Sequence, residues 1–138
     1  MTDAGILTDT LRSESRSFLQ YVREAFPWAE GKNEATRSKV LEIATAEESA
    51  IQSLASRLLK QHVTLPAMGG FPASFTTSNF VAVDYLIPRL ITAQKQGIAA
   101  IASSLAAAQD PDAKAQLQEL HDLKSGHLQQ LESLRSSP

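Results

Sequence analysis

Four segments of this chain carry apolar residues at three- and four-residue intervals, the period of a helix with one buried face. Asp110-Pro111-Asp112 opens the last segment with a capping residue, a proline at the first helical position and an acidic first turn. The pattern predicts an all-α fold. The expected helices cover about Asp3 to Phe26, Asn33 to the residues before Pro66, Asn79 to Ala108, and Asp110 to Leu134.

Pro88 lies inside the third segment. Because proline removes a helical hydrogen bond and clashes with the preceding turn, the sequence predicts either a kink there or a regular helix that starts near Ile87. Thr77 and Ser78 are the candidate caps for this helix.

The connections between the segments predict how the helices are arranged. Short links around Gly31 and Asp110 join the first helix to the second and the third to the fourth, so each pair is expected to form an antiparallel hairpin. The middle link, about residues 62–78, contains VTLPAMGGFPASFTTS and is long enough to run the length of a bundle. Two hairpins joined by one long crossover is the arrangement of a ferritin-like four-helix bundle.

Composition limits the classes of protein that this chain can belong to. Its 138 residues, 43% hydrophobic, suit a single domain spanning residues 1–138. A net charge of −2 and the lack of a basic run argue against nucleic acid as a partner, and the absence of cysteine excludes disulfides and thiolate metal sites. The N-terminus is polar and acidic, and no apolar run is long enough to span a membrane, so we expect a cytoplasmic protein that does not bind membranes.

Polar residues interrupt the apolar stripe of each expected helix. Glu14 falls inward on the first helix, Glu48 on the second with Glu47 as the adjacent alternative, and Gln94 on the third with Asp84 on the same face. The fourth stripe carries two ionisable side chains, Lys124 and His127, at positions where leucines are expected. Counting residues from the two short turns puts Glu14 level with Glu48 and Gln94 level with Lys124. The two pairs fall in one layer near the middle of the bundle if the two hairpins are in register.

The chain resembles the ferritin-like family, in particular its rubrerythrin-like diiron members, over nearly its whole length. That family places a glutamate on its first and third helices and Glu-x-x-His on its second and fourth, all pointing inward around two metal ions. Carried over by position, Glu14 matches the first glutamate, Glu48 the second and His127 the last histidine. The resemblance implies a bundle with a diiron-type layer at its centre.

The remaining positions depart from the family pattern. Ile51 stands in place of a histidine, and Gln94 and Lys124 stand in place of glutamates. Because an amide and an ammonium cannot offset the charge of two divalent cations, we expect no metal and no cofactor. Lys124 instead supplies the positive charge of a buried polar cluster, predicted to comprise Glu14, Glu48, Gln94, Lys124 and His127. If a metal is present, iron or manganese, its expected ligands are Glu14, Glu48 and His127, with Glu47 and Asp84 as further candidates.

Two functions from different classes follow from this site. The first is a non-metal binding, scaffold or assembly module, for which a small molecule or a protein is the ligand. The second is a diiron or mononuclear metal oxidoreductase with an atypical ligand set, so the sequence leaves open whether the protein is an enzyme. Simpler interpretations also remain open: Glu14 at the solvated edge of its stripe, and Lys124 with its ammonium reaching water. Apolar residues around Phe71 and Phe75 predict a homodimer.

Overall fold

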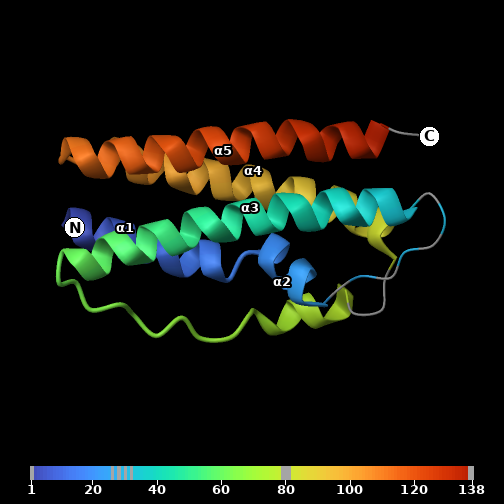
Figure 1. Cartoon of the computed structure of the whole chain (residues 1–138), viewed down its shortest axis with the longest axis horizontal. Coiled ribbons are helices and arrows are strands. Elements are labelled where there is room, and N and C mark those ends of the chain that lie inside the picture. Colours follow the sequence, from blue (N-terminus) through green and yellow to red (C-terminus); the bar gives the residue numbers. More distant parts are fainter. Residues whose placement is uncertain are drawn as a thin grey trace.

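The fold consists of helices that lie side by side along one long axis (Figure 1). A computed structural model describes residues 2–25, 27, 29, 31, 33–78 and 82–136. The predicted helix boundaries at Phe26 and Asn79 lie outside these residues. The elements are α1 (Asp3–Ser15), α2 (Phe18–Ala25), α3 (Asn33–Lys60), the short 3-10 helix η1 (Ala73–Ser78), α4 (Val83–Ala107) and α5 (Pro111–Ser136).

The first expected helix is two helices, which corrects the prediction of one continuous element. The break falls at Arg16 and Ser17. Ser17 Oγ accepts a hydrogen bond from the backbone N–H of Gln20 at 3.2 Å and so caps α2, while Arg16 Nε donates to the carbonyl of Gly70 at 2.8 Å. The serine cap thus starts α2, and the bond of Arg16 ties the break between the two helices to the long link.

Local capping accounts for several of the other helix ends. Asp110 Oδ2 accepts from the backbone N–H of Ala113 at 3.1 Å, which confirms Asp110 as the cap of α5. At the end of α3, His62 has a φ of 61° and Val63 N–H donates to the carbonyl of Leu58, the pattern of a helix closed by a left-handed residue. Helix α4 starts at Val83 with Ala82 as its N-cap, so neither Thr77 nor Ser78 caps it, and Pro88 lies within it.

The long link runs along the outside of the helices (Figure 1). The end of α3 and the turn between α4 and α5 lie at the same end of the molecule as the N-terminus, and the C-terminus lies at the other end. Hydrogen bonds support this placement, because the carboxylate of Asp3 accepts from the backbone N–H groups of Gln109 at 3.1 Å and Asp110 at 2.6 Å. None of the described helices has an apolar stretch long enough to cross a membrane.

Two phenylalanines of the link pack on α2. The ring of Phe75 lies 5.1 Å from that of Phe18, and the ring of Phe71 lies 5.3 Å from that of Tyr21, centroid to centroid. Phe71 and Phe75 are thereby half-buried against the same chain. The homodimer expected from these two residues stays a prediction.

The buried apolar side chains form two separate clusters. One includes Leu11, Ile51, Ile101 and Leu120, and the other includes Phe18, Ala44, Ile91 and Leu131. Each long stripe therefore passes from one cluster to the other across a short polar interval. The polar side chains in that interval divide the core in two.

Candidate functional site

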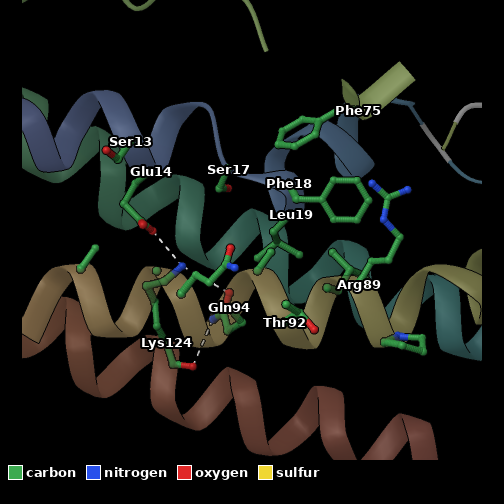
Figure 2. A pocket seen from close by; sticks show the side chains of 16 residues that line it. Ser13, Glu14, Ser17, Phe18, Leu19, Phe75, Arg89, Thr92, Gln94 and Lys124 are labelled. Carbon is green, nitrogen blue, oxygen red and sulfur yellow. Dashed lines mark hydrogen bonds and ion pairs between the residues drawn. The ribbon is translucent and has the colours of Figure 1, made fainter. Parts of the chain in front are cut away.

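Lys124 of α5 lies at the centre of the polar interval and is only 1% exposed. Its Nζ lies 2.8 Å from Glu14 Oε1, 2.9 Å from Glu47 Oε1 and 3.2 Å from Gln94 Oε1 (Figure 2 shows the contacts with Glu14 and Gln94). These three oxygens come from α1, α3 and α4, so one ammonium group links all four long helices. A buried lysine is tolerated here because each of its N–H groups has an acceptor nearby.

Glu47 makes three polar contacts in this interval, as many as the Lys124 ammonium. Its Oε2 accepts from Gln94 Nε2 at 2.7 Å and lies 2.7 Å from His127 Nδ1, in addition to the contact of Oε1 with Lys124. Because an ionised carboxylate only accepts hydrogen bonds, the hydrogen in the contact with His127 belongs to Nδ1. We call these five residues the polar layer: Glu14, Glu47, Gln94, Lys124 and His127.

Glu14 differs from Glu47 in how well it is satisfied. It is 4% exposed, and the contact of its Oε1 with Lys124 Nζ at 2.8 Å is the one polar contact of its carboxylate among the described residues. Glu47 has three such contacts, so Glu14 depends on Lys124 alone.

Burial and pairing act in opposite directions on the three charged groups. Burial raises the pKa of Glu14 and outweighs the lowering by Lys124, so that pKa lies above 4.5. Burial also raises the pKa of Glu47, but the hydrogen bond with His127 and the charge of Lys124 together hold it below 4.5. For Lys124, burial lowers the pKa, whereas the carboxylates of Glu14 and Glu47 raise it further, so the ammonium form persists above pH 10.5.

Gly97 of α4 leaves room for the lysine side chain. A Cβ at this position would lie 3.1 Å from Lys124 Cε, 3.4 Å from its Nζ and 3.5 Å from Glu14 Oε2. The first of these distances is shorter than ordinary van der Waals contact. The absence of a side chain at residue 97 therefore lets Lys124 cross the face of α4 toward Glu14.

The structure brings together Glu14, Gln94, Lys124 and His127, and it corrects the choice between the two adjacent glutamates of α3. Glu47 is 1% exposed and belongs to the layer, whereas Glu48 lies at the surface with its Oε2 3.2 Å from Arg23. The buried stripe of α3 explains the difference, because its members alternate by four and three residues around Glu47: Val40, Ala44, Glu47, Ile51, Leu54 and Leu58.

This correction also moves the position at which the ferritin-like pattern has the histidine of its second helix. Counted from Glu47, the histidine position of Glu-x-x-His is Ala50, in place of Ile51. Ala50 is partly buried. Asp84, the further candidate on α4, is exposed in the first turn of that helix and takes no part in the layer.

One buried polar residue near the layer escaped the sequence analysis. Gln20 of α2 is 4% exposed, and its Nε2 donates to the carbonyl of Ala44 at 2.8 Å, while its Oε1 accepts from Arg23 Nε at 3.0 Å. The break at Ser17 changes which face of α2 is buried, so a stripe continued from α1 does not reach Gln20. The Ser17 capping pattern is the signal that could have revealed it.

The donor set of the layer does not fit a pair of metal ions. Lys124 Nζ occupies the space between two carboxylates at hydrogen-bonding distance, and Gln94 offers a neutral amide where the family has a carboxylate. Among the described residues, no group of three or more histidine, cysteine, aspartate and glutamate side chains is arranged to hold a metal ion. A cation placed here would be repelled by the ammonium.

A pocket of about 590 Å³ reaches the layer from the outside. It lies between the junction of α1 with α2 and the middle of α4, and Figure 2 shows Glu14, Gln94 and Lys124 on one side of it and Phe18, Phe75 and Arg89 on the other. This volume is in the range of small-molecule sites. A scan against models of protein families and searches of curated proteins and of solved structures found no match to this chain.

Proposed function

We propose that this protein is a metal-independent binding module built on a ferritin-like bundle. In this arrangement α1 and α2 form one antiparallel hairpin with α3, α4 forms the other with α5, and the link between α3 and α4 is the crossover. The proposal is supported by the length of that link and by the positions of the termini and turns in Figure 1. The family resemblance and the convergence of four helices on one polar layer support it further.

One observation carries the metal-independent part of the proposal. The Nζ of Lys124 lies 2.8 Å from Glu14 and 2.9 Å from Glu47, carboxylates from two different helices. An ammonium in this position supplies the positive charge that metal ions supply in the family, and it keeps two buried carboxylates tolerable. Lys124 thus replaces the metal in its structural role.

Binding is favoured over catalysis because of what the layer offers chemically. The pKa of Lys124 is raised by its two carboxylate partners, so at neutral pH its ammonium has no lone pair for nucleophilic attack. Glu47 is engaged by three partners. A rigid charged layer beside an open pocket of ligand size is suited to holding a molecule in place.

A test restores the family ligands and asks whether metal then stabilises the fold. The variant Lys124→Glu with Gln94→Glu and Ala50→His places carboxylates and a histidine where the pattern requires them. Without metal it should melt well below the parent, because it adds unpaired buried negative charge. With Fe(II), Mn(II) or Zn(II) the melting temperature should rise, because a ligand that binds only the folded state stabilises it.

The matched control is Lys95→Glu with Gln96→Glu, which makes the same charge changes at two exposed positions of α4. It should change neither the melting temperature nor its response to metal. The unmodified protein should also show no metal-dependent shift. Stoichiometric iron or manganese in the parent would overturn the proposal, and so would a layer variant that melts like the parent and responds to no metal.

A further inference from the structure

The polar layer presents little polar surface to the pocket beside it. Glu14, Gln94 and Lys124 line the pocket, but they are only 4%, 2% and 1% exposed. Lys124 Nζ lies within 3.2 Å of three oxygens, as many as an ammonium has N–H groups. A polar group of a ligand would have to break one of these contacts to bind there, so it would gain little.

The rest of the pocket wall is largely apolar and comes from three parts of the chain. It includes Phe18 and Leu19 of α2, Leu90 and Ala93 of α4, and Phe75 of η1. A pocket lined in this way gains most from burying apolar surface. We therefore expect the body of a ligand to be apolar.

Arg89 is the one charged side chain outside the polar layer among the described residues that line the pocket. It is exposed on α4, and its guanidinium lies 4.7 Å from the centroid of the Phe18 ring (Figure 2). This contact and a bond to a carboxylate can coexist, because a guanidinium has five N–H groups in a plane that matches the two oxygens of a carboxylate. Arg89 therefore gives the pocket one end that favours an anion.

This end of the pocket is well separated from the buried carboxylate of Glu14. Arg89 and Gly97 both line the pocket and lie about 12 Å apart along α4, at about 1.5 Å per residue. Glu14 Oε2 is next to Gly97, where an added Cβ would lie 3.5 Å from it. An anion at Arg89 is thus distant from the charge of Glu14, which Lys124 also compensates at 2.8 Å.

We propose that this pocket binds an amphipathic carboxylate of medium chain length, with its carboxylate at Arg89 and its chain along Phe18, Leu90 and Ala93 toward the polar layer. The inference rests on the proposed function, because it names the ligand class of that binding module. The polar layer keeps all of its contacts when such a ligand binds.

The test compares three probes that share one alkyl chain and differ in their end group. At neutral pH octanoate is an anion, 1-octanol is neutral and octylamine is a cation. In titrations followed by amide NMR shifts, octanoate should bind at least about tenfold more tightly than 1-octanol, because its bond to Arg89 is charge-assisted. Octylamine should bind most weakly, and the largest shifts should be at Phe18, Leu90 and Ala93.

Substitutions of Arg89 separate its charge from the rest of the pocket. Arg89→Met keeps a long side chain and removes the charge, so it should weaken binding of octanoate by about tenfold or more and leave that of 1-octanol unchanged. Arg89→Lys should weaken octanoate less, because it keeps the charge and loses the planar fork. Lys95→Met removes a charge from an exposed position of α4 outside the pocket and should bind both probes like the parent.

A second pair of variants tests the apolar part of the pocket. Ala93→Phe fills the pocket from α4 and should abolish binding of octanoate and 1-octanol alike. Ala99→Phe makes the same change at an exposed position of α4 that does not line the pocket, so it should bind both like the parent. Because Arg89 is exposed, Arg89→Met decides the matter even if Ala93→Phe fails to fold.

The inference is overturned if octanoate does not bind at about 10 mM or binds no more tightly than 1-octanol. It is equally overturned if Arg89→Met or a folded Ala93→Phe binds octanoate like the parent. These outcomes are separate from the metal test. A parent that holds no metal and does not bind octanoate would remove only this inference. A parent that holds iron or manganese and binds octanoate would remove only the metal-independent part of the proposed function.

Discussion

Lys124 can occupy a position where leucine is expected because oxygens of neighbouring residues replace the contacts with water that its ammonium loses on burial. Its stem lies in the core, and its Nζ meets oxygens from three other helices at 2.8–3.2 Å. Burying a charge without such partners costs several kcal/mol, and removing one partner of a buried pair leaves the other charge uncompensated. The stabilising effect of Lys124 is therefore inseparable from the two carboxylates that it accompanies.

Lys124→Met should lower the free energy of unfolding at neutral pH by about 3–5 kcal/mol, because it leaves Glu14 and Glu47 buried without a cation. The pairing raises the pKa of Lys124 above 10.5, so its contribution is complete below that pH and is lost as the pH rises through the folded-state pKa. Urea denaturation from about pH 8 to about pH 12 should thus show the parent approaching the variant only at the alkaline end.

The control for this comparison is Lys95→Met, which removes the same charge from an exposed position of α4. Its free energy of unfolding should follow that of the parent at every pH. A difference between parent and Lys124→Met that stays constant through the alkaline range would mean that the ammonium is not the stabilising group.

At the scale of the helices, periodicity was enough to predict the type of element but not its exact phase. The all-α fold and the inward positions of Glu14, Gln94 and Lys124 follow from stripes that run across many turns, where one misplaced residue changes little. The choice between Glu47 and Glu48 depends on a single position. It needed the stripe to be extended to Val40 and Leu58, which alternate by four and three only through Glu47.

The interruptions of the helices were harder to predict, because they depend on contacts between distant residues. Arg16 Nε donates to the carbonyl of Gly70, 54 positions away in the sequence. The residues around Arg16 do not predict that bond. Ser17 is the local part of the signal, since serine is a good cap. Pro88 lies within a helix that starts at Val83, so the later start near Ile87 is wrong, and the kink at Pro88 stays a prediction.

Two glycines in the middle of long helices give a matched test of how tightly α4 packs on the layer. Gly126 of α5 has no atom within 4 Å of an added Cβ, so Gly126→Ala should raise the free energy of unfolding by up to about 1 kcal/mol through helix propensity. Gly97→Ala should instead lower the free energy of unfolding, because its Cβ would lie 3.1 Å from Lys124 Cε. The Lys124 side chain cannot easily move away, since its Nζ is held by three contacts.

Urea denaturation of the two alanine variants beside the parent measures this difference. In the Lys124→Met background the penalty at residue 97 should shrink, because the longer, fixed side chain is gone. If Gly97→Ala is as stabilising as Gly126→Ala, then Lys124 moves aside easily and the layer is not rigid.

In the molecule as a whole, the polar layer separates two apolar clusters that together hold the four long helices. Helices α3, α4 and α5 each pass from one cluster to the other through the layer. Helix α1 ends at the layer with Glu14, and Phe18 of α2 continues into the second cluster. A slide of any of these helices by one turn would put a charged or polar side chain into an apolar cluster and remove its partner. The layer thus fixes how the helices align along the bundle, at a cost in desolvation that an apolar core would not have.

That cost leads to a prediction about why the layer is there. Replacing the whole layer by apolar residues should leave the protein at least as stable as the parent, unlike Lys124→Met alone, because no charge remains buried without a partner. The variant is Glu14→Leu, Glu47→Leu, Gln94→Leu, Lys124→Met and His127→Leu. Its free energy of unfolding comes from urea denaturation, and the order of its packing comes from the dispersion of its amide NMR spectrum.

We expect a stable fold. Retained stability with a well-dispersed amide spectrum would mean that the helices hold together and align without the charges. A variant that is destabilised as much as Lys124→Met would show instead that the layer is a structural requirement. A stable variant whose amide spectrum shows broad, poorly dispersed lines would mean that the layer fixes the alignment of the helices. An apolar core of similar volume would then permit several alignments.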